Sequence, residues 1–142
     1  MAHILLVEDS PSDADLMIEV LTDFQPQHQI HVVENGVAAI SFLRRQTPYT
    51  QAPRPDLVLL DLNLPRQDGR EVLSHVKTDP DLGTIPIVVL TTSAATEDIR
   101  RAYELHANCY ITKPTDLDHF IQMVQSLEQF WLQVVQLPPR ST

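Results

Sequence analysis

The chain has 142 residues, about the size of one ordinary domain, and it carries 19 Asp and Glu against 10 Lys and Arg, a formal net charge of −9. This charge argues against a surface for nucleic acid or for an anionic membrane, because both need clustered basic side chains. With one cysteine, no recognisable signal peptide and no apolar run near the roughly 18 residues that span a bilayer, the sequence predicts a cytoplasmic protein.

The first elements predicted along the chain are a strand and a helix. Ile4–Val7 is a continuous apolar run, typical of a strand that is buried on both faces of a parallel sheet, and it ends in the acidic pair Glu8–Asp9. Ser10–Pro11 is typical of a helix start, and an apolar stripe predicts that this helix runs to about Asp23.

The same alternation of strand and helix continues to the end of the chain. The later strands are expected at Ile30–Val33, Leu57–Leu60, Ile87–Leu90 and Tyr110–Ile111, and the later helices at Val37–Arg45, Gly69–Lys77, Glu97–His106 and Leu117–Val135. Thr47–Pro55, with three prolines, is expected to be a loop. Five strand–helix units predict an α/β fold, a flavodoxin-like, doubly wound parallel sheet with helices on both faces.

Acidic side chains follow two of the predicted strands. Glu8 and Asp9 come after the first strand and Asp61 after the third, and ligands bind at the carboxyl ends of such strands. Each acid alone would read as a solvated loop residue or a helix cap. Together, three neighbouring carboxylates repel one another unless a cation compensates, and their hard oxygens favour Mg²⁺. The sequence therefore predicts a divalent-cation site.

A hydroxyl and a lysine follow the remaining strands. Thr91 comes after the fourth strand and Lys113 after the fifth, although Thr92 and Ser93 compete for the hydroxyl position; the spacing back from Lys113 favours Thr91. A set of three acids, one hydroxyl and one lysine suits phosphoryl transfer, in which an Asp carboxylate attacks while cations neutralise the phosphoryl oxygens.

From His3 to about Leu127 the chain resembles the receiver domains of two-component response regulators. The matching segments are LLVEDS, LVLLDLNLP with a glycine following, IVVLTTS and YITKP. The resemblance implies that a histidine kinase or a phosphotransfer protein phosphorylates Asp61. It implies a metal site and a phosphoryl site made of Glu8, Asp9, Asp61 and the backbone carbonyl of Asn63 around Mg²⁺, with Thr91 and Lys113 holding the phosphoryl group.

The same resemblance implies a switch and an architecture. Thr91 would move toward the phosphoryl oxygens while Tyr110 turns inward and reshapes the surface of the fourth helix and fifth strand. The sheet would be CheY-like, with strand order 2-1-3-4-5 and five helices, the last one extended. We expect a receiver domain over residues 1–135, a short tail over 136–142 and no output domain.

Two local features are left open or depart from the common receiver pattern, and three others indicate a subgroup of the family. The Lys113–Pro114 peptide is cis in the family, but the sequence also allows an ordinary trans proline. No glycine ends the fourth helix, so Asn108 is expected in the left-handed conformation. The long loop Thr47–Pro55, the VLTTS strand end and the extended last helix together resemble the small response regulators that partner cyanobacterial phytochrome-type histidine kinases.

Other functions compete with that of a phosphorylation switch. A phosphatase of the haloacid-dehalogenase type also uses a strand-terminal Asp, but it needs a second Asp two residues later, where this chain has Asn63. A flavodoxin-like cofactor binder needs a Ser/Thr/Gly-rich phosphate loop, and this chain has EDSPSD. A receiver that only docks would leave the acid, hydroxyl and lysine set unexplained. We therefore expect no enzyme activity beyond self-catalysed phosphoryl transfer and autodephosphorylation.

The last predicted helix has an unusually wide apolar face. One stripe holds Phe120, Ile121, Val124, Trp131 and Val135 and is expected to pack on the sheet; Met123, Leu127, Phe130, Leu132 and Val134 widen the arc. A homodimer through this helix and the nearby fifth-strand surface would cover the excess. The alternative is a long helix that packs entirely on its own domain.

Overall fold

A computed structural model describes residues 1–66 and 68–139, except for the side chain of Phe24. The elements in chain order are β1 (His3–Val7), α1 (Pro11–Phe24), β2 (Gln29–Val33), α2 (Gly36–Leu43), β3 (Leu57–Leu60), α3 (Gly69–Thr78), β4 (Ile87–Thr91), α4 (Thr96–Glu104), β5 (Cys109–Thr112), α5 (Leu117–Glu128) and the π-helix η1 (Gln129–Val134). All strand pairs are parallel, in the order β2-β1-β3-β4-β5. The predicted doubly wound fold and strand order are confirmed.

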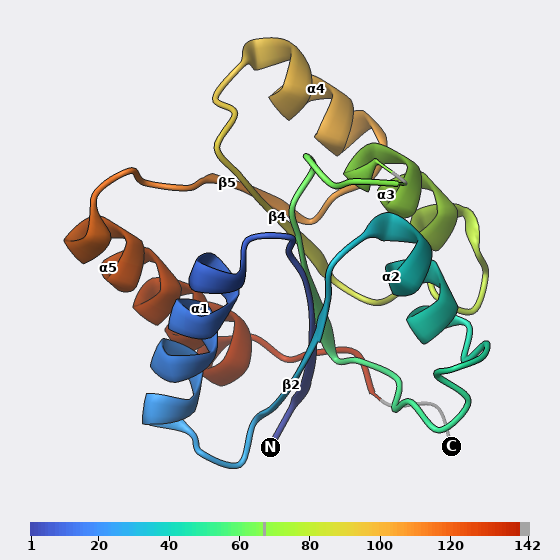
Figure 1. Ribbon diagram of the computed structural model, residues 1–142, viewed down its shortest axis with the longest axis horizontal. Helices are drawn as coiled ribbons and strands as arrows, with labels where there is room; N and C mark the ends of the chain where they lie inside the picture. Colours follow the sequence, from blue (N-terminus) through green and yellow to red (C-terminus); the bar gives the residue numbers. More distant parts are fainter. Residues whose placement is uncertain (67, 140–142) are drawn as a thin grey trace.

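The sheet lies between two layers of helices (Figure 1). Alternate residues of β1 point to opposite faces: Ile4 and Leu6 pack under α1 and α5, while Leu5 and Val7 pack under α2 and α3. Both faces of the central strands are therefore buried, which explains why their sequences are continuous apolar runs rather than alternating ones. The carboxyl ends of all five strands lie at one edge of this sheet.

The fourth helix ends differently from the prediction. α4 stops at Glu104, and His106, not Asn108, takes the left-handed conformation, with φ of 73°. The Asn108 prediction was wrong because the helix ends two residues earlier than its apolar pattern suggests. The side-chain oxygen of Asn108 instead accepts a hydrogen bond from the Ile87 N–H (2.9 Å), which ties the start of β4 to the turn before β5.

The last helix changes its geometry partway. After Glu128 the chain forms a π-helical segment, so the 3.6-residue period predicted to Val135 does not continue. Trp131 packs half-buried against the core under α1 and α5, whereas Phe130 and Val134 are 51% and 65% exposed. Two members of the expected apolar arc therefore face outward.

A buried polar pair lies where α5 becomes η1. Glu128 is fully buried, and its Oε1 lies 3.7 Å from Nε2 of His28, another buried residue. Nδ1 of His28 accepts a hydrogen bond from the Ala2 N–H (3.2 Å), and Gln133 donates to the second carboxylate oxygen (2.7 Å). These contacts hold the start of the π-helical segment against the first residues of the chain.

The remaining expectations concern the loop, the proline and the tail. Residues 44–56 contain no helix or strand, as predicted for Thr47–Pro55. Thr47–Pro48 is cis and Lys113–Pro114 is trans. Residues 136–139 have no regular secondary structure, and the rest of the expected tail, 140–142, lies outside the described residues. No helix of the described chain is both long and apolar enough to cross a membrane.

Candidate functional site

The carboxyl edge of the sheet brings the predicted site residues together. Asp61, directly after β3, donates its N–H to the last carbonyl of β1 (3.0 Å), and Lys113, directly after β5, donates its N–H to the carbonyl of Thr91 at the end of β4 (2.7 Å). Glu8, Asp61, Thr91 and Lys113 are all buried, each at most 8% exposed. The backbone hydrogen bonds of the parallel sheet therefore fix the backbone positions of these four residues at one edge.

Three carboxylates at this edge form a site suited to a cation. Glu8, Asp9 and Asp61 each present one oxygen, and these oxygens lie within 4.8 Å of one another. Glu8 and Asp61 are buried, while Asp9 is exposed and leaves the cluster open to water. Hard oxygens on one side and solvent on the other fit a divalent ion that keeps some of its water ligands. Asn63 lies beside them, its N–H donating to Asp61 Oδ1 (3.0 Å).

The ammonium group of Lys113 contacts three carboxylates. Nζ donates to Glu8 Oε1, to Asp13 Oδ2 (3.1 Å) and to Asp61 Oδ2 (3.2 Å). Burial alone would lower the pKa of Lys113, but the hydrogen bond and charge of Glu8, with the charge of Asp61, raise it above its usual value. Lys113 is therefore a permanent positive charge at the bottom of the acidic cluster.

Glu8 is the carboxyl group most affected by its surroundings. Burial raises its pKa to about 7, against the opposing effect of the hydrogen bond and charge of Lys113. In the metal-free chain Glu8 thus titrates near neutral pH. A cation at this edge would compete with that proton, because a metal binds the deprotonated carboxylate.

The hydroxyl of Thr91 contacts Asn63, the residue two positions after Asp61. Thr91 is fully buried, and its Oγ1 accepts a hydrogen bond from Asn63 Nδ2 (3.2 Å). Of the two competing hydroxyls, Thr92 is exposed and Ser93 Oγ donates to Asp98 Oδ2 in α4 (2.5 Å). Of the three hydroxyls, the one favoured by the spacing is therefore the buried one that contacts Asn63.

Tyr110 belongs to a chain of contacts that leads away from this edge. Its half-buried hydroxyl donates to the carbonyl of Ser93 (2.8 Å), and burial raises the pKa of the phenol. Ser93 in turn holds Asp98, which also accepts from Arg70 Nη2 (2.6 Å). The loop after β4 is thereby joined to β5, α3 and α4.

Gly69 is required by the backbone of the segment that follows β3. A Cβ at this position would lie 2.4 Å from the carbonyl oxygen of Asp61 and 2.6 Å from Cα of Leu62. The first residue of α3 therefore packs directly on the backbone that carries Asp61, and any side chain there would displace it.

Comparisons with known proteins agree with this geometry. Residues 4–125 match the family described as the response regulator receiver domain. The chain belongs to this family.

The receiver is 52% identical to Response regulator Rcp1 of Synechocystis over 95% of its own length and 92% of that protein. Its structure is similar to two solved relatives. One is described as the Mn(2+)-bound form of Rcp1, with a TM-score of 0.95, 50% identity and coverage of 98% of this chain and 100% of that one.

The second solved relative is the phosphorylated cyanobacterial phytochrome response regulator RcpA. Its TM-score is 0.94, with 47% identity and coverage of 97% of the receiver and 99% of that chain. The resemblance to cyanobacterial phytochrome response regulators predicted from the sequence is therefore confirmed. By their descriptions, one of these two relatives holds a divalent cation and the other is phosphorylated.

Sequence reasoning does not identify two residues of this site, Asp13 and Arg70. Both lie in the first turn of a helix, α1 or α3, so no strand end predicts their position. Asp13 has the spacing of a capping-box acid after Ser10, which is a purely structural interpretation. Only the orientation of the helices in the folded receiver shows that these side chains reach Lys113 and Asp98.

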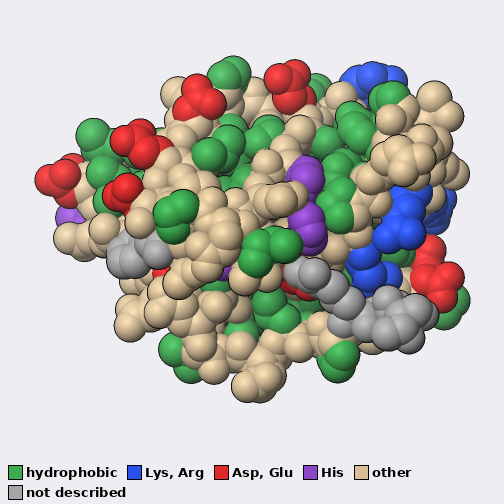
Figure 2. All heavy atoms as spheres, turned by 90° about the horizontal axis from the view of Figure 1, so that it is seen from below, with side chains coloured by type: hydrophobic (Ala, Val, Ile, Leu, Met, Phe, Trp, Pro, Cys, Tyr) green, Lys and Arg blue, Asp and Glu red, His purple; other side chains and the backbone are tan. Residues whose placement is uncertain are grey.

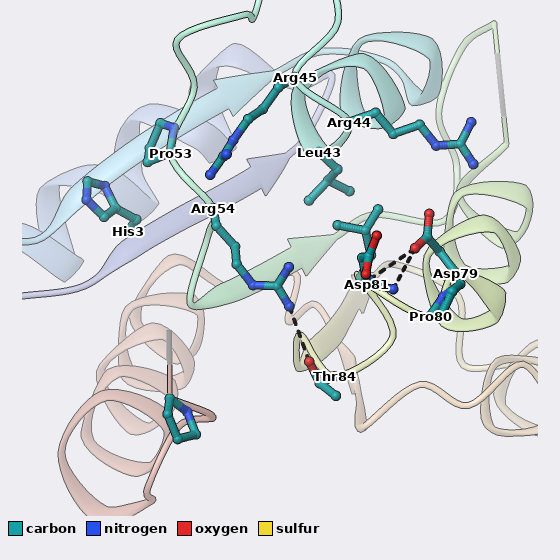
Figure 3. A pocket seen from close by; sticks show the side chains of 12 residues that line it. His3, Leu43, Arg44, Arg45, Pro53, Arg54, Asp79, Pro80, Asp81 and Thr84 are labelled. Carbon is teal, nitrogen blue, oxygen red and sulfur yellow. Dashed lines mark hydrogen bonds between the residues drawn. The ribbon is translucent and has the colours of Figure 1, made fainter. Parts of the chain in front are cut away.

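A cavity of about 1030 Å³ lies at the opposite edge of the sheet, and none of the site residues line it. His3, Arg45 and Arg54 line it from β1 and from the segments after α2 and before β3 (Figure 3). Figure 2 views the molecule from this side and shows basic side chains close to acidic ones. Asp79 and Asp81, on the α3–β4 loop, offset part of the arginine charge. This cavity is therefore separate from the three-carboxylate cluster at the carboxyl edge.

Proposed function

We propose that this receiver accepts a phosphoryl group on Asp61 from a phosphohistidine of a sensor histidine kinase or of a phosphotransfer protein, in a Mg²⁺-dependent reaction. The observation that carries the proposal is that Asp61 belongs to the three-carboxylate cluster, contacts Lys113 and follows β3, the strand that pairs with the Thr91 strand β4. Glu8 shares the first two features, but it follows β1, which does not pair with β4. Nucleophile, cation site and countercharge thus lie within one small volume.

In the proposed reaction an Asp61 carboxylate oxygen attacks the phosphorus atom. A new O–P bond forms, the P–N bond of the phosphohistidine breaks, and the departing imidazole keeps the electron pair of that bond and takes up a proton from solvent. Lys113 and the Thr91 hydroxyl would donate to the phosphoryl oxygens. Mg²⁺, held by Glu8, Asp9, Asp61 and the Asn63 carbonyl, would neutralise negative charge as the phosphoryl group moves.

Phosphorylation of the purified receiver by a small-molecule donor such as acetyl phosphate tests this proposal. We expect one phosphoryl group per chain by intact mass when Mg²⁺ is present, and at least about 100-fold slower labelling in EDTA, because the carboxylates then repel the incoming anion. Ca²⁺, a larger hard cation, serves as a comparison ion. Equal labelling with and without a divalent cation would contradict the role of the metal.

The proposal treats the receiver as a switch and not as a phosphatase. The residue two positions after the acceptor is Asn63, whose side-chain amide donates a hydrogen bond to Thr91 Oγ1. An amide does not act as a general acid or base, so Asn63 cannot play the role of the second Asp in a phosphatase. Turnover of a small phosphate ester by the purified chain would favour the phosphatase instead.

We propose that Thr91 and Tyr110 transmit the signal. A hydroxyl that moves toward a new phosphoryl group would give up its contact with Asn63, and the loop after β4 would shift with it. That loop holds the Tyr110 hydroxyl through Ser93, so its movement would change the surface of α4 and β5, where a partner protein could read it. The relatives support an upstream kinase of the phytochrome type.

We also propose a homodimer through the final helix and the nearby surface of β5. Phe130 and Val134 on η1 and Leu117 at the start of α5 are more than half exposed. The alternative, in which the whole helix packs on its own domain, accounts for Leu127 and Trp131 but leaves Phe130 and Val134 in water. A second copy would cover the same residues on both chains in one symmetric contact.

Size-exclusion chromatography with and without beryllofluoride and Mg²⁺ tests the dimer. We expect elution as a dimer, and elution as a monomer for the double variant Phe130→Ser with Val134→Ser, because the change removes the apolar area that drives association. Val32→Ser, at an exposed apolar residue on the edge strand β2, is the matched control. A wild-type monomer under both conditions would contradict the dimer and leave the acceptor proposal intact.

A further inference from the structure

Asp13 contacts Lys113 from α1, whereas the three carboxylates of the proposed metal site follow the strands β1 and β3. Its carboxylate lies 3.1 Å from Lys113 Nζ, but it is not part of the three-carboxylate cluster of Glu8, Asp9 and Asp61. The side chain of Asp13 is 35% exposed, whereas that of Lys113 is 4% exposed. Asp13 is therefore the most exposed partner of the lysine ammonium, and Glu8 and Asp61 are its buried partners.

The orientation of Asp13 is not that of an ordinary helix cap. In a capping box the acid three residues after the N-cap accepts a hydrogen bond from the N-cap N–H. Here Ser10 Oγ does accept from the Asp13 N–H (3.4 Å), but the Ser10 N–H is directed to Glu8 Oε2 (3.4 Å). The Asp13 carboxylate, which the helix start could have used, is directed to Lys113 instead.

The ammonium group of Lys113 has three N–H donors and three carboxylate partners. When Asp61 becomes phosphorylated, one donor has to leave Asp61 Oδ2 for a phosphoryl oxygen. The cation would then bind Glu8 and compete with Lys113 for the Glu8 carboxylate oxygens. Of the three partners, only Asp13 has no other role in the reaction.

From this geometry we propose that Asp13 is a positioning residue that holds Lys113 in place while its other two partners change during phosphorylation. The inference rests on the proposed acceptor role of Asp61. Without the negative charge of Asp13, Lys113 would pair more tightly with Asp61 and Glu8, which would weaken the nucleophile and compete with the cation. Phosphorylation would then be slower, although every group that reacts is still present.

The test compares Asp13→Asn with Asp15→Asn. Both changes remove one charge from α1 and keep the side-chain shape, but Asp15 is exposed. With acetyl phosphate and saturating Mg²⁺ we expect Asp13→Asn to lower the phosphorylation rate about five-fold, the size of one ordinary net hydrogen bond, because Asp13 is partly exposed; we expect Asp15→Asn to change the rate less than about two-fold. Equal rates for the two variants, next to normal wild-type labelling, would overturn the inference and leave the proposed function standing; an unlabelled wild type would instead contradict the proposed function.

A second readout shows whether Asp13 acts through Lys113. The chain has two lysines, and the other one, Lys77, donates to the carbonyls of Gly83 (3.1 Å) and Ile85 (2.8 Å), far from Asp13 in sequence. In ¹H–¹⁵N spectra of the lysine ammonium groups, Asp13→Asn is expected to shift or broaden the Lys113 signal and leave the Lys77 signal unchanged. An unchanged Lys113 signal would overturn the inference whatever the rate. In a Lys113→Gln background, Asp13→Asn is expected to have no further effect on the rate.

Discussion

The Asp61→Asn variant is expected to take up no phosphoryl group from acetyl phosphate at saturating Mg²⁺, under conditions that label the wild-type chain fully. The neutral amide keeps the size of the carboxylate and an oxygen that can accept from the Asn63 N–H, so the edge of the sheet can keep its shape. It lacks the negative charge that makes the carboxylate a nucleophile, and it removes one of the three carboxylates from the cation site.

Two controls make this loss specific. Asp15→Asn, on the exposed side of α1, is expected to be labelled like the wild type, and circular dichroism is expected to show the same fold for both variants. In the absence of a cation, Asp61→Asn relieves repulsion with Glu8 and is expected to be at least as stable as the wild type. Labelling of Asp61→Asn at the wild-type rate would place the acceptor elsewhere and contradict the proposed function.

The part of the site that lies at strand ends could be predicted from the sequence. A buried parallel strand reads as an apolar run, and the residue that follows it must lie at the carboxyl edge of the sheet. For that reason Glu8, Asp61, Thr91 and Lys113 could be grouped without any knowledge of side-chain direction. The choice of Thr91 over its two neighbours followed from the same register, and the structure places only Thr91 beside Asn63.

The part of the site contributed by helices could not be predicted in this way. The rotation of α1 about its axis decides whether Asp13 faces Lys113 or water, and that rotation depends on how residues such as Met17 and Leu21 pack, which spacing alone does not specify. The last helix shows a related limit. A 3.6-residue period was assumed to Val135, whereas the π-helical segment after Glu128 changes which apolar side chains face outward.

The Lys113→Gln variant is expected to lose about 3 kcal/mol of unfolding free energy in EDTA at neutral pH, because it removes the partner of buried carboxylates and leaves Glu8 facing Asp61. Saturating Mg²⁺ is expected to recover most of this loss, since the ion supplies the missing positive charge at the same edge. Lys77→Gln, the change at the other lysine, would also lower stability, but its loss should not depend on Mg²⁺, because Lys77 contacts only carbonyl oxygens.

The pH dependence of the metal-free wild type gives an independent check on this charge balance. The pKa of Glu8 is raised from 4.5 to about 7, so the folded chain binds the Glu8 proton more tightly than the unfolded chain does. The Glu8 contribution to stability is therefore fully present below pH 4.5 and is lost as the pH rises through about 7. Lys113→Gln removes the hydrogen bond and the charge that lower the pKa of Glu8. In this variant the loss of stability should therefore extend to higher pH. Chemical denaturation in EDTA across this range measures both curves, and identical slopes for the two proteins would mean that Lys113 does not control the charge of the site.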